Sequence, residues 1–205
     1  YTGSKDIILG SPISGRNHPD LEGQIGFYVN TLAFRIGIDP KASFTELLLR
    51  VKNICSGGYS HQTYPFDSLV DELSLLRDTS RHPLFDVMVT YQGVDGEASK
   101  INYESSIDKL HVVSKFDLTF NFVDQGDALG IGIEYSRDLF NESTAVRMLD
   151  HLEELLGSIV SNPEVTLSSL SYLSQEERSI LLEEFNATGT EYPKEKTIVG
   201  LFEEQ

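Results

Sequence analysis

The chain has 205 residues, of which 40% are hydrophobic and 10% aromatic, so it can bury a sizeable core and lacks the composition of a disordered protein. Its 32 acidic residues outnumber its 16 basic ones, and the net charge of −16 argues against nucleic-acid phosphates or an anionic membrane as partners. A single cysteine, Cys55, excludes an internal disulfide framework and favours a reducing, cytoplasmic compartment.

Strands and a loop are predicted for the first 36 residues. Residues 6–10 form a short apolar run that predicts a buried strand, which the breakers Gly10 and Pro12 are expected to end. Residues 14–23 lack periodicity and predict a loop. Residues 27–36 are rich in aromatic and branched side chains, which is typical of a strand.

Two helices are predicted next. Ser43 and Glu46 have the spacing of a capping box, in which each side chain satisfies a free backbone amide. Gly57 and Gly58 are expected to end this helix. Its predicted apolar face consists of Phe44, Leu47, Leu48, Val51, Ile54 and Cys55. A second helix is predicted to begin near Pro65. The side chains that it would bury are Phe66, Leu69, Val70 and Leu73.

Three segments with period-two alternation predict strands, at residues 85–91, 116–122 and 129–135. The last two are joined through residues 124–127 and predict an antiparallel hairpin. Between the first two, residues 95–115 are polar and irregular.

The C-terminal part is predicted to be helical. A long amphipathic helix begins near Asn141 and is expected to stop before Asn162, and a thin pattern from 164 to 174 predicts a connector. Ser174 and Glu177 form a second capping box. Mixed strands and amphipathic helices predict an α/β (α+β) two-layer sandwich, with helices packed against a largely open sheet.

No metal site is predicted, because the five histidines lack the spacing of a helical site and one cysteine cannot supply a zinc cluster. His61 is expected to fix a turn through local hydrogen bonds. No stretch approaches the roughly 20 apolar residues of a membrane span, so no membrane partner is expected.

The arginines have two interpretations. Arg16 lies in a loop, Arg35 ends a strand, and Arg77, Asp78 and Arg81 cluster before a proline. One interpretation is solvated charge with local ion pairs, which contribute little to stability. The other is that Arg16 reaches a carboxylate elsewhere in the protein, because a planar guanidinium suits a partly buried bidentate pair.

Three motifs carry a family resemblance: Ile-Gly-Phe-Tyr-Val-Asn-Thr from residue 25, His-Gln-Thr-Tyr-Pro-Phe-Asp from 61, and Arg-Asp-Thr-Ser-Arg-His-Pro-Leu from 77. Each resembles a signature motif of the C-terminal half of a nonribosomal peptide synthetase condensation domain, in that family's order and spacing. Residues 10–16 also match its Gly-Thr-Pro-Val-Ser-Gly-Arg pattern, with Ser11 and Ile13 as conservative departures. The family's His-His-x-x-x-Asp-Gly motif does not occur in this sequence.

The resemblance implies a fold like that of chloramphenicol acetyltransferase, in which two similar lobes enclose a tunnel. This chain would be the C-terminal lobe only, and the catalytic histidine would lie on the missing N-terminal lobe. Donor and acceptor carrier domains would bring phosphopantetheine-bound substrates from opposite ends, and the reaction would form an amide bond. The fragment alone is expected to be inactive and to bind no cofactor itself.

The resemblance also assigns supporting roles to residues of this chain, none of them catalytic. Arg16 would pair with the aspartate of the missing motif across the lobe interface. Asn30 would support the tunnel region, as would Arg77, Asp78 and Arg81 of the third motif. The polar residues 95–115 fall where the family's crossover toward the other lobe lies.

The tail from residue 182 resembles the opening of an adenylation domain. We therefore expect residues 1–163 to be the N-terminally truncated lobe, 164–181 a linker, and 182–205 the start of an adenylation domain. The expected partners are the missing lobe, the donor and acceptor carrier domains and the downstream adenylation domain.

Two alternatives remain. A degenerate member of the same fold would hold carriers or recruit partners without chemistry, and the sequence upstream would then lack the paired histidines. A free-standing acyltransferase using coenzyme A is disfavoured by the adenylation-like tail.

Overall fold

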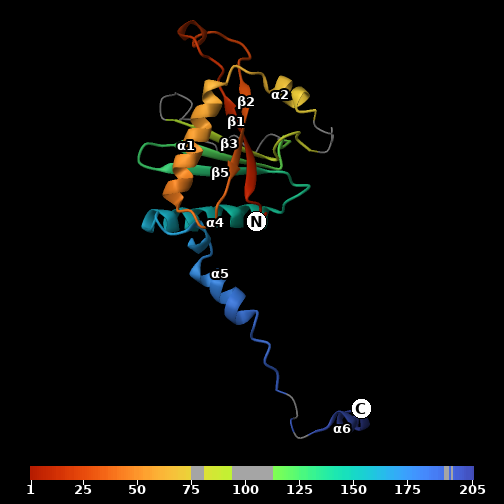
Figure 1. Ribbon diagram of the computed structural model, residues 1–205. Helices are drawn as coiled ribbons and strands as arrows, with labels where there is room; N and C mark the ends of the chain where they lie inside the picture. Colours follow the sequence, from red (N-terminus) through yellow and green to blue (C-terminus); the bar gives the residue numbers. More distant parts are fainter. Residues whose placement is uncertain (75–80, 94–112, 192–193, 195) are drawn as a thin grey trace. The chain divides into compact units, whose positions relative to one another are not determined.

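The computed structural model describes residues 1–74, 81–93, 113–191, 194 and 196–205. Contacts divide the chain into two units, Tyr1–Tyr172 and Leu173–Gln205. The first unit contains a mixed sheet with its strands in the order β2-β1-β3-β4-β5, together with helices (Figure 1). The predicted α/β class, with helices packed on an open sheet, is confirmed.

The sheet combines antiparallel margins with a parallel centre. Its strands are β1 (Asp6–Ile13), β2 (Asn30–Gly37), β3 (Val87–Gln92), β4 (Leu118–Asp124) and β5 (Leu129–Tyr135). β1 pairs antiparallel with β2, and β3 pairs parallel with both β1 and β4. β4 and β5 form the predicted antiparallel hairpin.

The helices of the first unit begin where the capping signals predict. The α-helices among its described residues are α1 (Phe44–Ser60), α2 (Phe66–Glu72) and α4 (Glu142–Ser161). The capping box of α1 is confirmed, since Ser43 N donates to Glu46 Oε2 at 2.8 Å and Glu46 N donates to Ser43 Oγ at 3.2 Å. α4 starts after Asn141 and ends before the Asn-Pro pair, as predicted.

The main core lies between α1 and β2. Leu32, Phe34 and Ile36 alternate along β2 and are buried. The side chains of α1 that pack against them are Leu47, Val51, Ile54 and Cys55. Figure 1 shows α1 lying over the strands. Burial raises the pKa of the Cys55 thiol, which favours its protonated form.

The predicted end of β1 is wrong, because the strand continues through Gly10 and Pro12 to Ile13. Its pairing with β2 extends over the full strand, whereas its register with β3 is confined to Gly10. A proline is tolerated where one side of a strand has no neighbour to receive its missing N–H. Gly10 allows close packing, since a Cβ there would lie 2.1 Å from the ring of Phe85.

The predicted end of α1 is also wrong, because the helix passes through Gly57 and Gly58 and ends at Ser60. A Cβ at Gly58 would lie 2.5 Å from the ring of Phe34, so this glycine serves packing between helix and sheet. Two side chains predicted to be buried are half exposed instead, Leu48 at 54% and Leu73 at 50%.

The second unit has short helical segments separated by irregular chain where the structure describes it. It contains α5 (Gln175–Ser179), a π-helical turn (Ile180–Glu184) and α6 (Ile198–Glu204). Ser174 Oγ accepts from Glu177 N at 3.1 Å and so caps α5, which confirms the Ser174 half of the predicted capping box. Within the described ranges, no helix has the length and apolar character needed to cross a membrane.

Candidate functional site

The amide of Asn30 joins two of the sequence motifs. Asn30 is the first residue of β2, and its Nδ2 donates to the carbonyl oxygens of Gln62 at 2.9 Å and Tyr64 at 2.8 Å. Its Oδ1 accepts from Phe66 N at 3.2 Å. Phe66 is the first residue of α2, and the N-cap residue, Pro65, has no side-chain hydrogen bond to offer. A strand residue thus caps a helix more than 30 residues away.

His61 fixes the turn between α1 and this junction, as predicted. It is the C-cap residue of α1, and its Nδ1 lies 2.9 Å from the carbonyl oxygen of Gly57. Because a carbonyl only accepts, this contact requires the proton on Nδ1. The Ser60 hydroxyl donates to the same carbonyl at 2.7 Å. The second motif is therefore held at both ends by polar contacts to helix termini.

Arg16 organises the loop between β1 and β2. Its Nη1 donates to the carbonyl oxygen of Leu21, and its guanidinium lies 4.4 Å from the centroid of the Tyr28 ring. The preceding Gly15 has φ +63°, and a Cβ there would lie 1.9 Å from the carbonyl oxygen of Tyr28. This position accepts only glycine.

The loop that Arg16 holds presents apolar side chains to solvent. Ile25 and Phe27 are 104% and 92% exposed, and Val29 is half exposed. Tyr28 points back toward the loop, where its hydroxyl donates to Gln24 Oε1 at 2.9 Å. Adjacent large apolar side chains at such exposure mark a surface that another element covers.

The third motif is described only from Arg81 onward, and Arg77 and Asp78 lie outside the described residues. Arg81 forms an ion pair with Asp86, with Nε 3.3 Å from Oδ1. Most of the predicted crossover, residues 94–112, also lies outside the described ranges.

His82 sits in an aromatic cluster that joins α2 to the starts of β3 and β4. Its ring centroid lies 4.2 Å from that of Phe85, 4.9 Å from Phe116 and 5.4 Å from Phe66. Its Nδ1 is buried and, among the described residues, has no hydrogen-bond partner. Desolvation lowers the pKa of His82, and the nearby charge of Asp86 opposes that shift in part.

A polar strip on the sheet was not anticipated from the sequence. Thr90 Oγ1 donates to Asn121 Oδ1 at 2.6 Å between β3 and β4, and Gly132 of β5 is registered beside Asn121. The space where a Cβ of Gly132 would lie is open. The registers place this strip on the face opposite α1. Alternation alone could not reveal it, since polar residues on a strand usually face bulk water.

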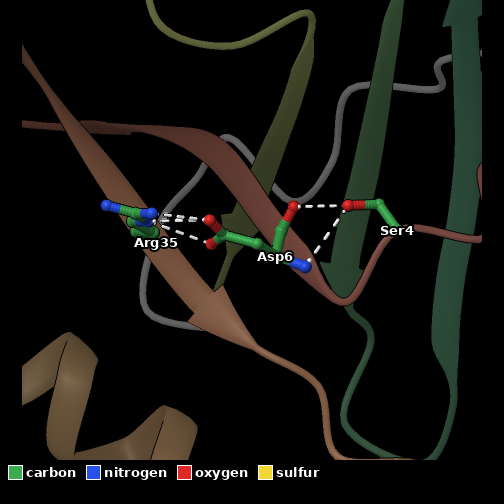
Figure 2. Close-up of polar contacts among 3 residues, drawn as sticks. All are labelled: Ser4, Asp6 and Arg35. Atoms are coloured by element: carbon green, nitrogen blue, oxygen red, sulfur yellow. Dashed lines mark hydrogen bonds and ion pairs between the residues drawn. The ribbon is translucent and has the colours of Figure 1, made fainter.

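For Arg35, the structure supports the first of the two interpretations, a solvated charge in a local ion pair. It forms a surface ion pair with Asp6, as Figure 2 shows, with Nη2 2.6 Å from Oδ2 and Nε 3.0 Å from both carboxylate oxygens. The Ser4 hydroxyl donates to the Asp6 carbonyl at 2.7 Å. Hydrogen bonding to Arg35 is the main cause that lowers the pKa of Asp6; desolvation opposes this shift in part, and the charge of Arg35 adds a smaller lowering.

The described site residues position loops and helix ends rather than perform acid–base chemistry. Asn30 bonds to backbone groups, Arg16 to a carbonyl and a ring, and Arg81 to a neighbouring carboxylate. Among the described residues, no group of three or more His, Cys, Asp or Glu side chains could hold a metal ion. This arrangement suits a surface that binds another molecule and orients it.

A family model described as "Condensation domain" matches residues 1–182. Surfactin synthase subunit 1 of Bacillus subtilis (strain 168) is 44% identical over all of this chain, which covers 6% of that protein. Gramicidin S synthase 2 of Brevibacillus brevis is 40% identical over all of this chain, which covers 5% of it. The chain therefore spans only a small part of these relatives.

Solved structures share the fold at lower identity. A holo-AB3403 four-domain nonribosomal peptide synthetase, bound to AMP and glycine, gives a TM-score of 0.81 at 19% identity over 97% of this chain and 16% of that one. The X-domain from teicoplanin biosynthesis, in complex with OxyB, gives 0.71 at 22% identity over 85% of this chain and 39% of that one. The first condensation domain of the CDA synthetase gives 0.65 at 17% identity over 84% and 39%.

Proposed function

The chain belongs to the condensation-domain family, and on that premise we propose that it is the C-terminal lobe of a nonribosomal peptide synthetase condensation domain that forms amide bonds. The observation that carries this proposal is the match of the whole chain to a small part of peptide synthetases at 44% and 40% identity. The junction at Asn30, where two motifs meet, supports it.

The proposed reaction joins two carrier-bound substrates. The amine nitrogen of the acceptor attacks the thioester carbonyl carbon of the donor, the carbon–sulfur bond breaks, and the departing phosphopantetheine thiolate takes up the proton that the amine loses. A neutral amine needs mainly orientation and a proton acceptor, so positioning supplies much of the rate. The proton acceptor would be a histidine of the N-terminal lobe, which would pass this proton on to the departing thiolate. This chain would supply the opposite wall of the tunnel.

We propose that Arg16 pairs across the lobe interface with the aspartate of the missing motif. One of its five N–H donors is used within the loop, and its stacking on Tyr28 fixes the plane of the guanidinium. The exposed Ile25 and Phe27 support a covering lobe on this side. The same loop would then both form part of the lobe interface and orient the guanidinium of Arg16.

Asn30 and Arg81 would act indirectly, by holding backbone that borders the tunnel. Asn30 fixes the entry of α2, and Arg81 ties the chain to Asp86 just before β3. We extend the same supporting role to Arg77 and Asp78 from the family resemblance alone. The polar strip of Thr90 and Asn121 would line the wall.

We further propose that residues 164–181 are a linker and 182–205 the start of an adenylation domain. The condensation-domain match ends at residue 182, which supports the start proposed for the next domain. So does α6, whose Ile198 and Phe202 are 87% and 81% exposed, as expected of a helix that packs on further protein. Donor and acceptor carriers, with their phosphopantetheine arms, would be the other partners.

One observation favours a second function. The X-domain from teicoplanin biosynthesis shares this fold and is found in complex with OxyB, so a domain of this shape can assemble with a partner protein. A recruiting module without chemistry is therefore the alternative. It holds if the sequence upstream of Tyr1 carries no paired histidines.

The decisive experiment uses the full-length synthetase with loaded donor and acceptor carriers. Arg16→Ala should reduce kcat/KM for condensation by at least about 100-fold or prevent folding, because breaking a buried ion pair costs about 3–5 kcal/mol. Arg16→Lys keeps the positive charge but lacks the planar guanidinium, so its kcat/KM should lie between the values of the wild type and Arg16→Ala.

Hydrogen exchange of residues 17–28 separates the two roles of Arg16. If Arg16→Ala accelerates exchange in this loop but leaves condensation intact, the cross-lobe role is rejected and only the contacts to Leu21 and Tyr28 remain. Absence of peptide product from the wild-type synthetase, with intact adenylation and carrier loading, would favour the recruiting module.

A further inference from the structure

A buried histidine of α4 contacts the first and last residues of the first unit at once. His151 is 8% exposed. Its Nδ1 lies 2.5 Å from the hydroxyl of Tyr1, and the two rings stack with centroids 5.9 Å apart. On another side, the ring of Tyr172 meets the imidazole edge-to-face at 5.2 Å. Two segments at opposite ends of the unit thus share one partner.

The segment that ends at Tyr172 is bound along its length to the first unit. We call residues 163–172 the strap. Leu167 N donates to the Ala42 carbonyl at 2.8 Å, and Ser168 N donates to the Pro40 carbonyl at 3.0 Å. Near its end, Ser171 N donates to Ser158 Oγ of α4 at 3.3 Å. These bonds fix the strap to the residues before α1 and to α4.

The last contact of the strap is the aromatic one at His151. Tyr172 closes the first unit, and Leu173 opens the second. The Tyr1 hydroxyl contacts the ring nitrogen and so contributes to the orientation of the imidazole, and that orientation decides which edge of the ring meets Tyr172. A leucine of similar size could fill the space but could not couple the two segments.

We propose that His151 is a clasp, a positioning residue that locks the strap and the N-terminal segment together on α4, so that loss of one contact loosens the other. The clasp holds Tyr172, the last residue of the first unit, against α4. This inference rests on contacts inside the first unit and does not depend on the proposed function.

The test is hydrogen exchange of the full-length protein, followed on peptides that cover the strap. Tyr1→Phe removes one hydroxyl from a residue that is 82% exposed, so it opens no cavity. If the clasp couples the segments, the amides of Leu167, Ser168 and Ser171 should exchange about three- to tenfold faster, the effect of losing one net hydrogen bond. Exchange in β4 and β5 should not change.

The reciprocal variant is Tyr172→Ala, which should accelerate exchange at residues 2–6 by a similar factor. His151→Ala should loosen both segments together. Glu153→Ala, an exposed position on the same helix, is the matched control and should change neither. If His151→Ala disturbs the whole sheet, Tyr1→Phe still decides the question. Strap exchange in Tyr1→Phe equal to that in the Glu153→Ala control would overturn the clasp and leave two independent contacts.

Discussion

The junction at Asn30 and the ion pair of Asp6 with Arg35 each use three hydrogen bonds to join distant segments, but they lie in different surroundings. Asn30 is half-buried and bonds to backbone groups at and just before the start of α2, where Pro65 offers no side-chain cap. Asp6 and Arg35 lie on the surface, where water can replace each bond (Figure 2). How much a contact stabilises the fold therefore depends on whether water can reach the polar groups that lose their partner, and not on the number of hydrogen bonds.

The largest effect is expected from Asn30→Ala. The substitution would leave the carbonyls of Gln62 and Tyr64 and the amide of Phe66 without this partner, at a cost of about 2 kcal/mol in local stability. Hydrogen exchange of residues 62–72 in the full-length protein should accelerate by roughly the corresponding 30-fold.

Asn30→Asp is the matched variant. It keeps an acceptor for the amide of Phe66 but loses both donors, so exchange should accelerate less than in Asn30→Ala. Equal exchange in the wild type and Asn30→Ala would show that water substitutes for this amide as readily as it does for the surface pair.

A smaller effect, dependent on pH, is expected at His82. Burial among three phenylalanines lowers its pKa below the ordinary value of 6.5, so the folded state binds fewer protons than the unfolded state in the window below 6.5. The stabilisation by neutral His82 is complete above that window and is lost as the pH falls through it toward the folded-state pKa.

The measurement compares denaturant midpoints between pH 7.5 and 5 for the wild type and His82→Leu. The variant cannot titrate at this position, so its midpoint should fall less on acidification, while the other histidines contribute equally to both. A larger fall in the variant would mean that protonated His82 is stabilised by the aromatic faces and by Asp86.

The smallest effect is expected from Arg35→Ala. Arg35 and Asp6 are exposed, and salt screens their attraction, so the unfolding midpoint at neutral pH should stay within the error of measurement. Because pairing lowers the pKa of Asp6, whatever stability the pair adds is present above about pH 3.8 and is lost as the pH falls further. A shift at pH 7 as large as that of Asn30→Ala would contradict the contrast between the two regions.

Local signals in the sequence predicted much of the fold, and contacts between distant segments account for what they missed. The capping box at Ser43 and the strand Leu129–Tyr135 depend on near neighbours and were predicted correctly. Gly58 was misinterpreted as a helix end because its reason for being glycine, the ring of Phe34, lies on another element.

The candidate site shows the same limit. The motif resemblance identified Asn30 and Arg16 as candidate site residues. The capping of α2 by Asn30, however, has no local sequence signal. The stacking of Arg16 on Tyr28 likewise requires the loop to fold back on itself, which the spacing alone does not specify. The cross-lobe role of Arg16 stays a prediction, as do the tunnel-supporting roles of Asn30, Arg77, Asp78 and Arg81.

The strap bears on where this chain could be joined to foreign sequence. A chimera spliced at residue 163 would replace the chain that bonds to Pro40 and Ala42 with foreign sequence and would leave the residues before α1 to find new partners. A splice after Tyr172 would keep every one of those bonds with its native host, and only the helices that follow would be exchanged.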